Sequence, residues 1–110
     1  MQFLKSEKRT WWIKIYISGP MQEIEQVCRR MASDVGLCVT VDPTKFIYSG
    51  GEESGAVVGL IQYPKYPTDE RVITDRAMIL ADALLVATHQ DSVLVMTPTT
   101  TTWISKGENP

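Results

Sequence analysis

The spacing of apolar residues changes abruptly at Ser18-Gly19-Pro20, and this change sets the order of the first two elements. Between Trp11 and Ser18 the residues alternate, with the isoleucines pointing one way, which predicts a half-buried strand. After Pro20, apolar residues recur every three or four positions, which predicts an amphipathic helix that Gly36 ends. The helical stripe consists of Met21, Ile24, Val27, Cys28, Met31 and Val35.

The rest of the chain repeats this switch with an extra strand in between. A second strand is expected at 37–41, and it resumes at 44–48 after a break at Asp42-Pro43. A glycine-rich hairpin tip, 49–55, then leads into a third strand at 56–63. The third strand is apolar on both faces, so both of its faces need a cover.

A second helix and a fourth strand complete the pattern. Thr68 is expected to cap a helix that runs to about Thr88. The segment 92–97 predicts a fourth strand, and 99–106 is extended again, either as a hairpin or as a bent continuation. The order β-α-β-β-α-β predicts an α+β, ferredoxin-like sandwich with two helices on one face of an antiparallel sheet.

The open face of such a sheet is expected to be covered by another copy of the chain, as a dimer or trimer. A chain of 110 residues still exposes much of its surface, so association would add burial. The residues expected at this homo-oligomer interface are Trp12, Tyr16, Val57, Ile61 and Trp103.

Composition predicts one domain at 11–106, between flexible tails at 1–10 and 107–110. A net charge of −2 argues against binding to nucleic acid polymers. Cys28, Cys38 and His89 fit no metal-binding spacing, so neither a metal nor a cofactor is expected. No apolar run is long enough to cross a bilayer and no signal peptide is recognisable, so a cytoplasmic location is expected.

The run KIYISGP, residues 14–20, resembles the first strand and turn of the nucleoside deoxyribosyltransferases. This resemblance implies an enzyme that acts on a nucleotide or sugar-phosphate at the Ser18-Gly19-Pro20 corner. The glycine-rich hairpin stands where that family continues with a parallel strand and crossover, and Glu23 and Glu25 come too early for its catalytic glutamate.

The central run LCVTVDPTKFIYSGGEESGAVVGLI, residues 37–61, resembles the hairpin of the trimeric CutA-like and PII-like proteins. The resemblance implies a ferredoxin-like fold and self-association. The size and aromatic content are also similar to those of small accessory proteins of bacteriophages, which would place the chain in the host cytoplasm.

The sequence therefore favours a small, oligomeric, non-enzymatic module. Its expected role is to capture a small anionic ligand, such as a nucleotide or cyclic nucleotide, or to inhibit a host protein as a phage antagonist of defence. The alternatives are the enzyme implied by the corner and a purely structural oligomer. The expected ligand contacts are Ser18, Gly19, Ser49, Gly50, Gly51, Glu52, Glu53, Tyr63, Lys65, Tyr66 and Arg71.

Overall fold

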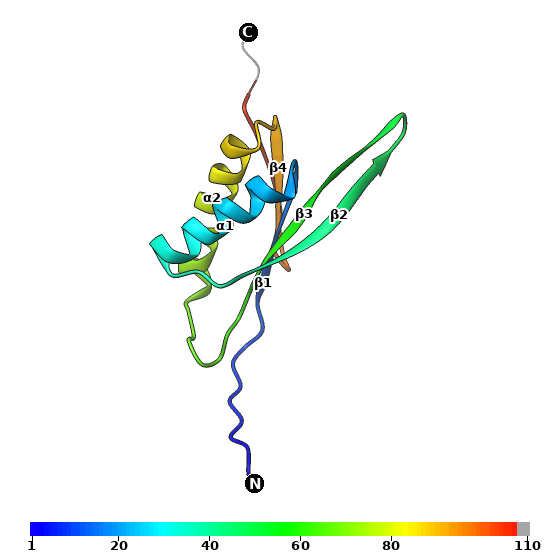
Figure 1. The fold of residues 1–110 in the computed structure, drawn as a ribbon. Coiled ribbons are helices and arrows are strands. Elements are labelled where there is room, and N and C mark those ends of the chain that lie inside the picture. Colours follow the sequence, from blue (N-terminus) through cyan, green and yellow to red (C-terminus); the bar gives the residue numbers. More distant parts are fainter. Residues whose placement is uncertain (108–110) are drawn as a thin grey trace.

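The protein has five strands and two helices in a computed structural model that describes residues 1–107 (Figure 1). In chain order they are β1 (Trp12–Ser18), α1 (Met21–Val35), β2 (Val39–Tyr48), β3 (Gly51–Ile61), α2 (Glu70–Ala87), β4 (Ser92–Met96) and β5 (Thr101–Ser105).

The strands form one antiparallel sheet in the order β2-β3-β1-β4-β5, with β1 at its centre. Both helices lie on the same side of this sheet (Figure 1). The expected ferredoxin-like sandwich is confirmed, and the fifth strand is present as a hairpin with β4.

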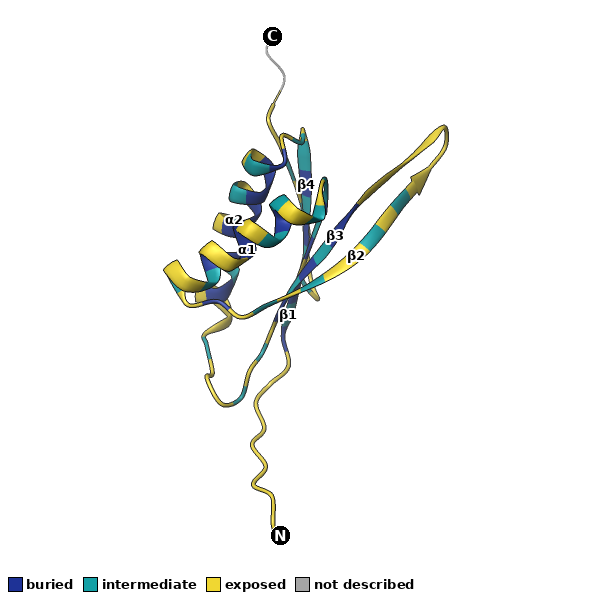
Figure 2. Cartoon of the chain, in the orientation of Figure 1, coloured by how far each residue is buried: buried dark blue, intermediate teal, exposed yellow. Residues whose placement is uncertain are grey.

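The core lies between the helices and one face of the sheet, where Figure 2 shows the buried residues gathered. Ile13, Ile15 and Ile17 of β1 are almost completely buried there, as the alternation predicted. They pack with α1 through Ile24 and with α2 through Leu80, among others. Burying a side chain of this size contributes roughly 1.5–3 kcal/mol, so this layer is the main source of stability.

The helix boundaries follow local chemistry. Gly36 ends α1 with φ of 69°, a left-handed conformation that glycine adopts without strain, as expected. At the start of α2, Asp69 rather than Thr68 is the N-cap, and its carboxylate accepts a hydrogen bond of 2.8 Å from the backbone N–H of Arg71. The prediction was one residue early because both residue types are good caps.

The central hairpin differs from its prediction. Strand β2 runs through Pro43 without a break, because β2 is an edge strand and one row of its N–H groups has no partner strand. The turn consists of Ser49 and Gly50 alone, and β3 already begins at Gly51. The predicted tip at 49–55 is therefore wrong, since most of it is strand.

The outer part of this hairpin, residues 44–54, is called the arm below. Pairing between β3 and β1 stops at Gly55, so in the arm β2 and β3 pair only with each other. The arm extends away from the helices as a two-stranded ribbon (Figure 1). An isolated ribbon of this kind is marginally stable, so something else is expected to support it.

The remaining sequence-based expectations concern the cysteines and the tails. Cys28 is buried, and this burial raises the pKa of its thiol to about 11, whereas Cys38 is exposed just before β2 and does not pack as a small hydrophobe. Residues 1–10 are exposed and form neither helix nor strand. The expected tail at 107–110 lies, from residue 108 onward, outside the described residues. Neither helix of the described chain is long and apolar enough to cross a membrane.

Replacing Gly55 by alanine is expected to destabilise the protein by about 3 kcal/mol, because the added Cβ would collide with the backbone carbonyl of Ile17 on β1. Gly59→Ala is the matched control in the same strand. Its Cβ would meet only the side-chain hydroxyl of Thr40, at 2.5 Å, which can rotate away at a cost of about 1 kcal/mol or less. Urea denaturation of both variants measures the difference, and equal losses would contradict this account of the close crossing.

Candidate functional site

A shallow cleft of about 520 Å³ lies on the sheet face that the helices leave open. Every strand contributes to it, because the register brings alternate residues of five neighbouring strands to one face. The cleft is lined by Tyr16, Ser18, Phe46, Tyr48, Glu53, Ser92, Val93, Leu94, Met96 and Trp103.

Glu53 supplies the only formal charge among these lining residues. Its Oε2 accepts a hydrogen bond of 2.8 Å from the Oγ of Ser18, at the end of β1. Glu53 itself lies on the arm, where it pairs with Phe46 of β2. The cleft therefore has a carboxylate at the border between the arm and the body of the sheet.

Tyr48 lies next to this carboxylate on the arm, with its ring over Gly51. Partial desolvation, and then the negative charge of Glu53 and a hydrogen bond with it, raise the pKa of the Tyr48 phenol above its ordinary value. The single O–H of the phenol is thus engaged with Glu53, while its oxygen can still accept a hydrogen bond from a ligand in the cleft.

Aromatic rings form much of the remaining surface. Tyr16 and Phe46 meet edge to face, with ring centroids 6.5 Å apart. Trp103 of β5 pairs with Leu94 and is 67% exposed, so its ring is available for contact. Aromatic faces beside a carboxylate suit a cation, and they suit an anion poorly. The residues lining this cleft include no cationic side chain, which does not fit the sequence-based expectation of an anionic ligand.

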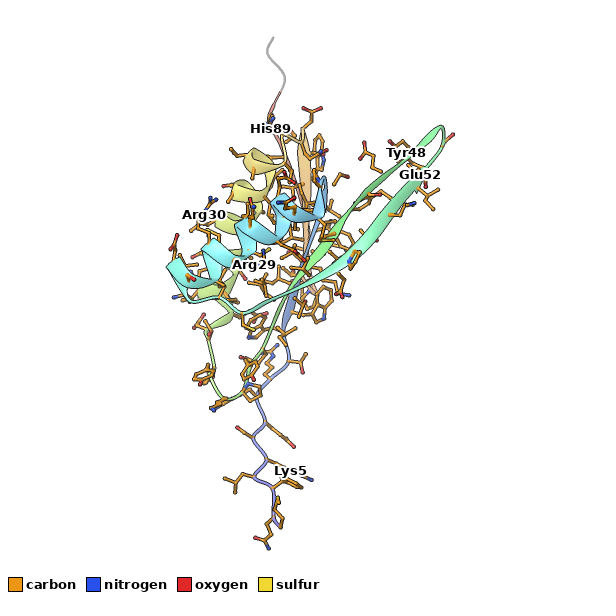
Figure 3. All side chains as sticks on the ribbon, in the orientation of Figure 1. Lys5, Arg29, Arg30, Tyr48, Glu52 and His89 are labelled. Atoms are coloured by element: carbon orange, nitrogen blue, oxygen red, sulfur yellow. The ribbon has the colours of Figure 1, made fainter. Side chains whose placement is uncertain are left out.

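The expected ligand contacts are divided among separate places. Ser18 and Glu53 meet in the cleft, whereas Glu52 lies on the opposite face of the arm, with its carboxylate 3.8 Å from the Nζ of Lys45. Figure 3 shows Tyr48 and Glu52 out on the arm, away from the helices. The N–H of Gly19 donates to the carbonyl of Ser54 at 2.9 Å, so it is not free to bind an anion. Ser49 and Gly50 form the exposed turn, and Gly51 begins β3.

The other expected contacts lie at the opposite end of β3. Tyr63 and Tyr66 stack with centroids 5.9 Å apart, and the Nζ of Lys65 lies 5.6 Å from the Tyr66 centroid. The two tyrosines border a cavity of about 320 Å³ with Trp11 and Leu37, and Arg71 follows on the first turn of α2. These residues do not line the open-face cleft.

The five residues expected at an interface do share the open face. Trp12 pairs with Ile61 and Tyr16 with Val57 across β1 and β3, and Trp103 lies on β5. Trp11, by contrast, is buried on the helix side, so it cannot join an aromatic platform with Trp12.

Sequence reasoning missed the contributions of β2 and β4 to the cleft, above all Phe46, Tyr48 and Leu94. The signal was present in the alternation of β2, where Phe46 and Tyr48 share one face. The expected break at Asp42-Pro43 hid this signal, because after a kink the alternation no longer predicts which face of the sheet Phe46 and Tyr48 occupy.

Among the described residues no group of three or more histidine, cysteine or acidic side chains is arranged to hold a metal ion.

Solved structures match this fold over almost the whole chain. A phage SAM lyase in its apo state aligns with a TM-score of 0.82 and 11% identity, covering 99% of this chain and 100% of that one. A phage SAM lyase in complex with S-methyl-5'-thioadenosine aligns with a TM-score of 0.63 and 14% identity, covering 96% of each chain. The fold is that of the phage SAM lyases.

A third structure, the periplasmic divalent cation tolerance protein CutA from Archaeoglobus fulgidus, aligns with a TM-score of 0.49 and 16% identity over 84% of each chain. No protein-family model and no curated protein matches the sequence. The resemblance to phage proteins that the sequence suggested is thus confirmed as a resemblance of fold.

These matches correct the expected function. The sequence favoured a non-enzymatic module, but the two structures that share the fold over nearly the full length are lyases. The preference for binding without turnover was therefore wrong, and the alternative of an enzyme, expected to act on a nucleotide or sugar-phosphate, is the better supported one. The reason for the error is that no catalytic motif is continuous in the sequence.

Replacing Glu53 by glutamine is expected to lower the pKa of Tyr48 toward its ordinary value, because the variant removes a negative charge that disfavours the phenolate. Glu52→Gln is the control, since Glu52 is adjacent in sequence but faces the other side of the arm. NMR titration of ring-labelled tyrosine measures the pKa of Tyr48 in both variants. A Tyr48 pKa that is the same in wild type and Glu53→Gln would contradict the coupling.

Proposed function

We propose that this chain is a lyase that cleaves S-adenosylmethionine (SAM), with the open-face cleft as its active site. The observation that carries the proposal is a single carboxylate among aromatic rings, on a fold that aligns end to end with that of a phage SAM lyase. SAM carries a sulfonium cation, which the rings of Tyr16, Phe46 and Trp103 can receive.

The chemistry of the bound product in one related structure supports a particular bond. S-methyl-5'-thioadenosine is SAM without its aminobutyrate group, so its formation breaks the bond between the sulfur and Cγ of that group. The electron pair of this bond goes to the sulfur, which becomes a neutral thioether. A carboxylate oxygen of the same substrate forms the new bond to Cγ and closes a five-membered lactone. Atoms and charges balance without water, an oxidant or a net proton transfer.

The cleft is suited to this step because opposite charges on the substrate disappear in it. An aromatic surface favours the mutual neutralisation of carboxylate and sulfonium over their hydrated forms, most of all where water is excluded from it. Loss of the sulfonium charge also removes the main attraction between the thioether product and the rings, which favours product release.

We assign the Glu53 carboxylate to bind the substrate's ammonium group. A carboxylate directly against the sulfonium would stabilise the substrate more than the transition state and would slow the reaction. The ammonium keeps its charge throughout, so binding it costs nothing at the reacting bond and fixes the position of the aminobutyrate chain. The Tyr48 phenol oxygen can accept a hydrogen bond from the same ammonium group.

The wild-type protein is expected to convert SAM into S-methyl-5'-thioadenosine and homoserine lactone. Glu53→Gln should lower kcat/KM by roughly 10- to 100-fold, mainly through KM, because a charge-assisted hydrogen bond worth about 1.5–3 kcal/mol is lost. Glu52→Gln should keep wild-type turnover. Chromatography of the nucleoside product measures the rates.

A run in ¹⁸O-labelled water, sampled early, separates a lyase from a hydrolase. The lyase forms lactone without the label, whereas hydrolysis would form labelled homoserine. Absence of any nucleoside product with the wild-type protein would refute the proposed function.

We further propose that copies of the chain associate through the open face. Ile61 is 49% exposed beside Trp12, and beyond Gly55 no third strand of the chain pairs with the arm. Covering this face would exclude water from the cleft and hold the arm in place. A dimer and a trimer both satisfy this requirement.

Replacing Ile61 by glutamate is expected to reduce the solution mass to that of a single chain, because a charge would be buried at the contact. Ile79→Glu is the matched control, since Ile79 is similarly exposed, at 53%, but lies on α2. Light scattering coupled to gel filtration measures the mass. A wild-type protein of single-chain mass would contradict the association.

Removal of SAM deprives every methyltransferase in the same compartment of its methyl donor. This consequence supports a role against host defence, as expected from the sequence. The mechanism would be consumption of a metabolite instead of ligand capture or inhibition of a host protein.

A further inference from the structure

We infer that Ser18 is a positioning residue that holds the Glu53 carboxylate in the orientation required to bind the substrate's ammonium group. The inference deepens the proposed lyase function and rests on it. The Oγ of Ser18 donates to the Oε2 of Glu53 at 2.8 Å, across 35 positions of sequence and between the body and the arm.

The backbone around Ser18 holds the two residues in this relation. Ser18 pairs with Gly55 at the last position of the β1–β3 ladder. The next N–H, that of Gly19, donates to the carbonyl of Ser54 at 2.9 Å. The Ser18-Gly19-Pro20 corner thus clamps β3 at the base of the arm, immediately beside Glu53.

Two glycines permit this close crossing. Gly55 has no Cβ, and one would collide with the carbonyl of Ile17. Gly19 has φ of 133°, which L side chains rarely adopt, and a Cβ there would lie 2.9 Å from the Cβ of Thr88. The corner whose sequence resembles the turn of the nucleoside deoxyribosyltransferases therefore joins β1 to the arm.

The glutamate needs such a partner because it lies on the least supported element. A glutamate side chain loses about 1.5–2 kcal/mol of rotamer entropy when it is held in one conformation. Glu53 is exposed, and the arm around it is only two strands wide. The serine hydroxyl donates to Oε2 and so restricts the carboxylate to one orientation. In the free protein it thus prepares the carboxylate for binding.

Ser18→Ala is expected to lower kcat/KM for SAM by roughly tenfold, which corresponds to the loss of one hydrogen bond to a charged group. Ser18→Thr should restore most of the activity, since it keeps the hydroxyl. Ser54→Ala serves as the control, because it keeps the backbone carbonyl that Gly19 uses while its side chain lies on the other face of the arm.

A double-mutant cycle separates positioning from a general structural effect. In the Glu53→Gln background, Ser18→Ala should have little further effect on kcat/KM, because the group that it positions has changed. Additive losses in the double variant would overturn the inference, and so would wild-type activity in Ser18→Ala.

Titration of Tyr48 gives a readout that does not require turnover. A released Glu53 side chain should act less on its neighbour, so in Ser18→Ala the pKa of Tyr48 should move part of the way toward its value in Glu53→Gln. An unchanged Tyr48 titration in Ser18→Ala would refute the positioning role, even for a wild-type protein that does not cleave SAM. An inactive wild type with the expected shift would refute the lyase function alone.

Discussion

The structure depends on β1, the central strand, which is hydrogen-bonded to β3 and β4 and buried on the face that the helices cover. Its isoleucines anchor the core, its other face supplies Tyr16 and Ser18 to the cleft, and its end forms the corner that holds the arm. Core, site and arm are therefore linked through seven residues. A shift of β1 by one position would exchange the isoleucines for Trp12, Lys14 and Tyr16 in the core, so its register is strongly specified.

Much of this architecture could be predicted from the sequence because β1 and α1 have clear periodicities. The alternation from Trp11 and the stripe from Met21 correspond to the elements observed, and Gly36 ends the helix as expected. The central hairpin was harder, because Pro43 and four glycines and serines at 49–51 and 54 are typical of loops. On an edge strand and at a strand crossing, these residue types are compatible with extended structure, and only the tertiary pairing reveals that context.

The candidate site could be predicted only in part. Ser18 and Glu53 were both expected as ligand contacts, and Tyr16 and Trp103 were expected on the open face. Their combination was not predictable, because it depends on the register of five strands and on the length of the arm. The expected anionic ligand also has no cationic partner among the residues lining the cleft. A corner that looks like an anion site in sequence has its N–H used by Ser54, while the neighbouring surface is acidic and aromatic.

The arm has a consequence for how the protein would behave at different concentrations. Glu53 and Tyr48 lie on a two-stranded ribbon that pairs with no third strand of its own chain, so contacts between copies would contribute to the geometry of each site. Specific activity would then depend on dilution: separated chains would keep the folded body built on β1, while the arm would loosen and the carboxylate would lose its alignment. Folding and catalytic competence would in that case respond to different variables, the first to temperature and denaturant, the second also to the amount of protein present.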